Sequence, residues 1–143
     1  MRLLRVFAIS ALAFIVACDS SDSSDVELGD VPADLVGTWV ATTLMVGGSD
    51  LVAQGTTFEI TFTADNSYSF TAANAPEDLF CDLATDCTSG GVFAIQGQTF
   101  IFDADESDPD DRTELAVMTL TATAFVLAGN IDSEAIQFVF ARQ

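Results

Sequence analysis

The chain has 143 residues, half of them hydrophobic, and carries 22 acidic residues against four basic ones, for a formal net charge of −18. Such an acidic surface is a poor partner for nucleic acids and for anionic lipid head groups. There is no histidine, so Ser-His-Asp catalysis is excluded. The acidic residues fall in loops or polar segments, where little would tune their pKa values for catalysis. We therefore expect a protein that is not an enzyme and uses no cofactor.

The first 17 residues have the features of an export signal. Arg2 and Arg5 precede an apolar run, Val6–Ala17, which only Ser10 interrupts. This run is too short to span a bilayer, which takes about 20 residues, but it suits the apolar core of a secretory signal peptide. We therefore expect residues 1–17 to be a signal peptide.

The apolar run ends in the sequence Ile15-Val16-Ala17-Cys18, which resembles the lipobox of bacterial lipoproteins. In that family the cysteine receives a diacylglyceryl group and the chain is cut just before it. The resemblance implies lipidation at Cys18, a membrane partner reached through that lipid, and a place in the bacterial cell envelope on the extracytoplasmic side. Asp19 resembles an inner-membrane retention signal of enteric bacteria. Other lineages do not all follow that rule, so both the inner and the outer membrane stay open.

Residues 18–30 combine Cys18 with a run of serines and acids, DSSDSSDVELGD. A segment with so little to bury and so much like charge is expected to be a disordered tether. Residues 31–143 then form one domain with one core. After removal of the signal peptide, two arginines oppose 22 acidic residues, a net charge of −20 that disfavours the compact state through self-repulsion.

Within the domain, short segments rich in Thr, Val, Ile, Phe and Tyr alternate between apolar and polar residues, which predicts strands. Turn residues separate the segments, and links this short favour antiparallel neighbours. The eight expected strands are Val36–Val46, Thr56–Thr63, Ser67–Ala72, Gly91–Ile95, Thr99–Ala104, Thr113–Leu120, Phe125–Gly129 and Ile136–Ala141. We predict an all-β fold, a small antiparallel up-and-down barrel of about eight strands, with an open sandwich as the rival.

A second resemblance runs from Asp34 to Arg142, nearly the whole domain. LVGTWVAT resembles the Gly-x-Trp start of the lipocalin-like barrels, with Gly37 and Trp39 in the matching places. TFEITFTADNSYSF, GGVFAIQGQTFIF and IQFVFAR resemble the later hairpins and the closing strand of the small bacterial members. Arg142 matches the basic residue that packs over the tryptophan in that family. The resemblance implies that Gly37, Trp39 and Arg142 close the barrel, and that a chain this short encloses a smaller cavity than typical lipocalins.

Large aromatic residues are expected to point into the barrel: Trp39, Phe58, Phe62, Phe70, Phe100, Phe102, Phe138 and Phe140. A barrel of eight strands is either filled by its own side chains or holds one small ligand. Two functions follow. The protein binds a small hydrophobic molecule inside the barrel, or it is a filled barrel that acts as a non-enzymatic interaction or structural protein of the envelope. An apolar cavity of roughly 300 Å³ or more would favour the ligand.

The long connection between the third and fourth expected strands carries two further features. Cys81 and Cys87 are the cysteines left after Cys18 and are expected to form a disulfide in an oxidising compartment. A metal site there would lack a histidine, and we predict no metal. Leu79 and Phe80, which are apolar, either cap the mouth of the barrel or pack on its outside.

The segment Asp103–Asp111, DADESDPDD, is strongly acidic. Its alternating aspartates resemble those of calcium loops, but the central glycine and the closing glutamate of the EF-hand are missing. A solvated acidic loop is the simpler interpretation, and calcium binding stays open.

Overall fold

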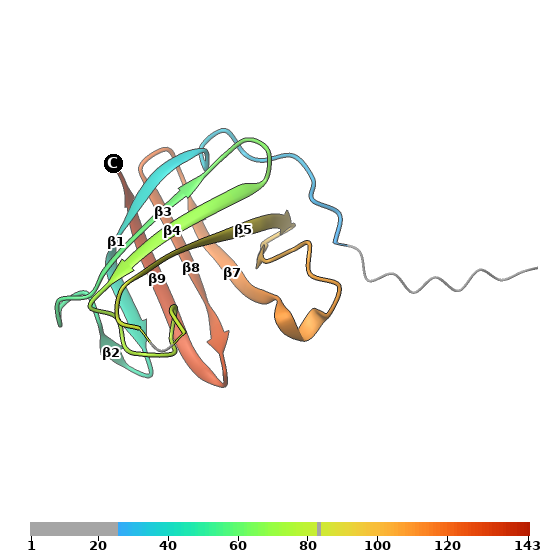
Figure 1. The fold of residues 1–143 in the computed structure, drawn as a ribbon. Helices are drawn as coiled ribbons and strands as arrows, with labels where there is room; N and C mark the ends of the chain where they lie inside the picture. The colour runs from blue at the N-terminus through green and yellow to red at the C-terminus, as the bar shows by residue number, and fades with distance from the viewer. Residues whose placement is uncertain (1–25, 83) are drawn as a thin grey trace, which may run out of the picture.

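The computed structural model describes residues 26–82 and 84–143 and shows one antiparallel sheet that closes into a barrel (Figure 1). The predicted signal peptide and the predicted lipidation site Cys18 lie outside the described residues. Within the part of the chain that the structure describes, no helix is long and apolar enough to cross a membrane.

The described residues form nine strands, all in this sheet, and one short 3-10 helix. In chain order they are β1 (Gly37–Val46), β2 (Ser49–Asp50), β3 (Thr57–Phe62), β4 (Ser67–Ala73), β5 (Cys87–Gln96), β6 (Thr99–Phe102), η1 (Pro109–Asp111), β7 (Thr113–Leu120), β8 (Ala124–Ile131) and β9 (Glu134–Arg142). β1 pairs with the two-residue β2 and with β3, each strand from β3 onward pairs with the next along the chain, and β1 also pairs with β9. The predicted all-β barrel of about eight strands is therefore confirmed, and the open sandwich is wrong.

The predicted and observed strands differ most at β5, which begins at Cys87 rather than at Gly91. The earlier start lets β5 pair with β4 as far as Ala72 opposite Cys87. This stretch contains few apolar residues, so alternation does not reveal it. Gly90 is needed inside the strand, because a Cβ there would clash with the carbonyl oxygen of Tyr68.

One end of the barrel, the packed end, is filled by aromatic side chains. Trp39, Phe62, Phe93, Phe100 and Phe125 are fully buried, and the centroids of their contacting rings lie 5.2–5.9 Å apart. Pairs of aromatic rings at such distances stabilise a core by more than the burial of their apolar area alone. The rings therefore fill much of the interior at this end with their own contacts.

The first and last strands meet at the packed end. Trp39 and Arg142 are paired positions of β1 and β9, and the Arg142 guanidinium carbon lies 4.7 Å from the centroid of the Trp39 ring. Arg142 Nη1 donates to the carbonyl oxygen of Val36 at 2.9 Å, and Nη2 donates to that of Asp34. A Cβ on Gly37 would lie 2.8 Å from Arg142 Nη1, so glycine makes room for the guanidinium.

The segment before β1 lies against the barrel. Leu35 is fully buried, and its carbonyl oxygen accepts a hydrogen bond from Trp39 Nε1 at 2.8 Å. Further back, Val26 packs against the small cluster formed by Ala94 and Ile101 on β5 and β6. Asn66 Nδ2 donates to the carbonyl oxygen of Leu28 at 3.1 Å. Residues 26–30, which were predicted to belong to the tether, thus contact the domain, and all the barrel contacts that the structure describes lie within residues 26–143.

Candidate functional site

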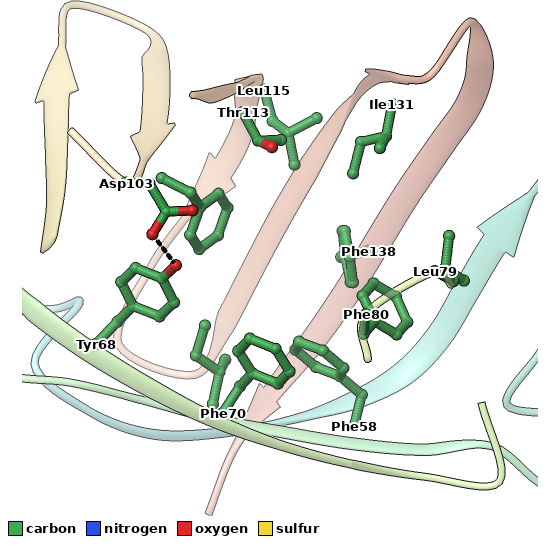
Figure 2. Close-up of a pocket in the computed structure, with 12 residues that line it drawn as sticks. Phe58, Tyr68, Phe70, Leu79, Phe80, Asp103, Thr113, Leu115, Ile131 and Phe138 are labelled. Carbon is green, nitrogen blue, oxygen red and sulfur yellow. Dashed lines mark hydrogen bonds between the residues drawn. The ribbon is translucent and has the colours of Figure 1, made fainter. Parts of the chain in front are cut away.

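The interior is open at the other end of the barrel, which we call the open end. A pocket of about 190 Å³ lies there, lined by β3, β4 and β6 to β9 and by the connections from β4 to β5 and from β6 to β7 (Figure 2). Its walls are mostly apolar. The residues that line it are Phe58, Ile60, Tyr68, Phe70, Leu79, Phe80, Phe102, Asp103, Thr113, Leu115, Ile131 and Phe138.

Four phenylalanines form the aromatic wall of the pocket, with Phe58 at the centre. The ring of Phe58 lies 5.1 Å from Phe70, 4.9 Å from Phe80 and 5.5 Å from Phe138, measured between centroids. Phe58, Phe70 and Phe138 come from β3, β4 and β9, where alternation along each strand turns them inward. Together they offer a ligand several ring faces and edges.

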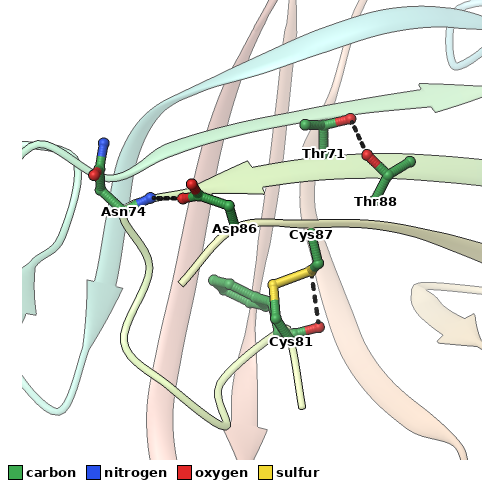
Figure 3. Close-up of a disulfide and its surroundings, with 7 residues drawn as sticks. Thr71, Asn74, Cys81, Asp86, Cys87 and Thr88 are labelled. Carbon is green, nitrogen blue, oxygen red and sulfur yellow. Dashed lines mark hydrogen bonds between the residues drawn. A yellow bond between two sulfur atoms is a disulfide. The ribbon is translucent and has the colours of Figure 1, made fainter. Parts of the chain in front are cut away.

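Phe80 and its neighbour Leu79 belong to the connection between β4 and β5, and they line the pocket rather than the outside of the barrel. The predicted disulfide between Cys81 and Cys87 is confirmed and ties this connection to the first residue of β5 (Figure 3). Asn74 N also donates to Asp86 Oδ1 at 2.8 Å, at the other side of the same connection (Figure 3). The loop that carries Phe80 is therefore fastened close to the pocket.

The pocket has one polar wall. Tyr68 Oη, from β4, donates a hydrogen bond of 2.7 Å to Oδ1 of Asp103, which directly follows β6 (Figure 2). Burial, above all, and the adjacent Asp103 carboxylate raise the pKa of the Tyr68 phenol well above its ordinary value. At neutral pH the phenol is therefore protonated and acts as a donor.

Gly91 makes this polar wall possible. It lies on β5, the strand between Tyr68 and Asp103, directly opposite Tyr68. A Cβ on Gly91 would overlap Asp103 Oδ1 and would lie 3.2 Å from Tyr68 Oη. Because glycine has no side chain, the carboxylate and the phenol can meet above the strand.

The structure divides the aromatic residues that the sequence analysis placed inside the barrel. Phe58, Phe70, Phe102 and Phe138 line the pocket. Trp39, Phe62, Phe100 and Phe140 are buried but do not line it.

Tyr68 and Asp103, which also line the pocket, were not predicted as pocket residues. Alternation placed Tyr68 on the same face as Phe70, so it could have been found. Asp103 lies beyond the end of a strand, where no pattern indicates direction.

In the acidic segment Asp103–Asp111, hydrogen bonds within the protein hold the side chains described below. Asp103 turns into the pocket, while Asp108 caps η1 by accepting a hydrogen bond from Asp110 N at 3.0 Å. Arg112 Nε donates to the carbonyl oxygen of Glu106 at 2.8 Å. Within residues 26–82 and 84–143, no group of three or more His, Cys, Asp or Glu side chains is placed to hold a metal ion.

A second hollow, of about 300 Å³, lies beside the turn between β5 and β6 and along β7. Gly97 and Gln98 at this turn are exposed, and Met118 on β7 is 62% exposed. This hollow belongs to the surface near the packed end and offers no charged side chain to a ligand.

Comparisons with known proteins add little to this description. No protein-family model matches the chain, and no curated protein matches it. A solved structure of a lipocalin-like protein from Bacteroides uniformis has a related chain trace, with a TM-score of 0.48 and 15% identity, over 77% of this chain and 99% of that chain. The fold of this protein therefore rests on its own strand pairings, which form the closed eight-strand barrel that the lipocalin-like resemblance implied.

Proposed function

We propose that this protein binds a small hydrophobic molecule in the pocket at the open end of its barrel and is not an enzyme. The observation that carries the proposal is the pocket itself, about 190 Å³ in volume and walled by Phe58, Phe70, Phe80 and Phe138. An apolar cavity of about 150 Å³ can already take up benzene. The pocket falls short of the roughly 300 Å³ expected above to favour a ligand, which is the volume at which drug-sized molecules fit. The ligand is therefore about one ring with a short substituent.

We further propose that the protein works in the bacterial cell envelope, where a lipid on Cys18 anchors it to the inner or outer membrane. The lipobox-like residues before Cys18 support this location. The disulfide between Cys81 and Cys87 also supports it, because such bonds persist mainly in oxidising, extracytoplasmic compartments.

The alternative is a filled barrel that acts as an interaction or structural protein of the envelope. The packed end favours it, because Trp39, Phe62 and Phe100 occupy that part of the interior completely. The pocket at the open end favours ligand binding, since protein interiors are normally close-packed and leave few unfilled spaces larger than a water molecule.

Native mass spectrometry of residues 26–143, produced in an oxidising compartment, tests the proposal. We expect an extra mass that disappears on denaturation. Ile131, which lines the pocket, and Asn130, the exposed residue before it on β8, offer a matched pair of variants. Ile131→Trp should fill the pocket and abolish the extra mass, and Asn130→Trp should retain it. The three proteins are also measured after exposure to a bacterial extract. If the wild type, Ile131→Trp and Asn130→Trp all then show only the mass of the bare protein, the filled barrel is favoured.

A further inference from the structure

We propose that the ligand is a small amine, protonated at neutral pH, whose apolar body enters the pocket and whose ammonium group pairs with the Asp103 carboxylate. This inference rests on the proposed function and specifies the chemistry of the same pocket. It is carried by the position of one carboxylate in an otherwise aromatic cavity.

The Asp103 carboxylate has capacity left for a ligand. Its Oδ1 accepts the hydrogen bond from Tyr68, and a carboxylate can accept several more. The contacts of the two described arginines lie elsewhere, since Arg142 stacks on Trp39 and Arg112 donates to the Glu106 carbonyl. An ammonium group on the ligand would bring a positive charge to Asp103 and form a charge-assisted hydrogen bond.

The aromatic wall suits the same kind of ligand. Figure 2 shows Tyr68 and Asp103 on one side of the pocket, with Phe80 and Phe138 across from them and Phe58 and Phe70 along another side. A cation near the carboxylate is also attracted by the faces of the surrounding rings. The rest of the ligand can then pack between the phenylalanines, away from the carboxylate.

The charge of the protein disfavours a negatively charged ligand. Asp105 adds to the negative charge near Tyr68 and Asp103, and the whole chain has a formal net charge of −18. Such a field raises the local concentration of cations and repels anions. A fatty acid or another carboxylate would have to place its charge beside Asp103 or turn it away into solvent.

Three probes with the same body and different charges test this inference by calorimetric titration of residues 26–143. These are 2-phenylethylamine, 2-phenylethanol and phenylacetate. We expect the amine to bind about tenfold or more tightly than the alcohol, and the acid to bind most weakly. This series needs no variant, so it is independent of any effect of mutation on folding.

Two variants then assign the preference to Asp103. Asp103→Asn retains an acceptor for Tyr68 but removes the charge, so the amine should lose its advantage in affinity over the alcohol. Asp105→Asn removes one charge from an exposed neighbour and should lower affinity for the amine by no more than about twofold.

Equal binding of amine and alcohol by the wild type, or an amine affinity that Asp103→Asn does not change, would overturn the amine inference and leave the proposed function standing. If none of the three probes binds to the wild type or to Ile131→Trp, both the amine inference and the proposed function are overturned.

Discussion

Tyr68 and Asp103 join β4 to the end of β6 across the intervening strand, through a hydrogen bond of 2.7 Å that passes above Gly91. The bond has a structural effect, since it ties two segments that do not pair directly. It also has a chemical effect, because it holds a carboxylate at the wall of an aromatic pocket.

The first prediction concerns the titration of Tyr68. It is the only tyrosine of the chain, so phenolate absorption reports this residue alone. Burial and Asp103 raise its pKa above the ordinary value of about 10. We expect phenolate to form only well above pH 10 in the wild type, and at a lower pH in Asp103→Asn, where the charge is gone. A phenolate signal that rises at about pH 10 in the folded wild type would contradict the burial and pairing of Tyr68.

The same shift predicts how stability depends on pH. The pKa of the phenol is higher in the folded than in the unfolded chain, so its contribution to stability is complete below about pH 10 and is lost as the pH rises further. The chain has no lysine, and Cys81 and Cys87 are bonded, so few other groups interfere there. In urea unfolding, Tyr68→Phe should cost about 1–2 kcal/mol at pH 7 and should lose less stability than the wild type above pH 10.

The second prediction is that Gly91→Ala separates Tyr68 from Asp103. The new Cβ would overlap Asp103 Oδ1, so the carboxylate must move away. We expect a loss of about 1–3 kcal/mol in the free energy of unfolding and a weaker preference for the amine probe. The double variant Gly91→Ala with Asp103→Ala removes the group that clashes, so the two costs should not add. Additive costs would show that Gly91 does not act through Asp103.

The third prediction concerns the disulfide. Replacing both Cys81 and Cys87 by serine should lower the free energy of unfolding by about 2 kcal/mol, the entropy of closing so short a loop. Because the disulfide fastens the connection that carries Phe80, binding of an apolar probe should weaken as well. Titration with 2-phenylethanol under oxidising and reducing conditions checks this on the wild type, with the serine variant as the control that reductant should not affect.

The fourth prediction is that Arg142→Ala destabilises the barrel by about 1–3 kcal/mol, because it removes the contact with Trp39 and the hydrogen bonds to Asp34 and Val36. Trp39 is the only tryptophan, so its fluorescence follows unfolding directly. Arg142→Lys retains the charge but not the planar fork, and it should recover only part of the loss. A melting curve of Arg142→Ala that matches the wild type would show that the stack contributes nothing.

The strands were predictable because one face of each is buried. Phe58, Ile60 and Phe62 alternate with polar residues, and this pattern directly reports a half-buried strand. The aromatic interior followed from the same reasoning. The split of the interior into a packed end and a pocket could not be predicted from alternation. The stagger of neighbouring strands decides whether a ring such as Phe62 or Phe70 lies at the packed end or in the pocket.

The site itself depends on features with no local pattern. Asp103 reaches the pocket because of the register between β4, β5 and β6 and because Gly91 leaves space. Phe80 reaches it because a loop folds back over the mouth, and the sequence left two placements open for that loop. In both cases long-range geometry, rather than the residues nearby, decides where the side chain lies.

The pairing of β1 with β9 has a consequence for how the chain folds. The other long strands pair with strands that are close in sequence, so their contacts need only short loops to close. The pairing of β1 with β9 joins residues as far apart as Trp39 and Arg142, and closing so long a loop carries the largest entropic cost. We expect a ribbon of hairpins to form early and the two ends to meet last. The rate of that last step sets how long the aromatic inner face stays exposed to water. During that time it can associate with another chain instead of closing the barrel of its own.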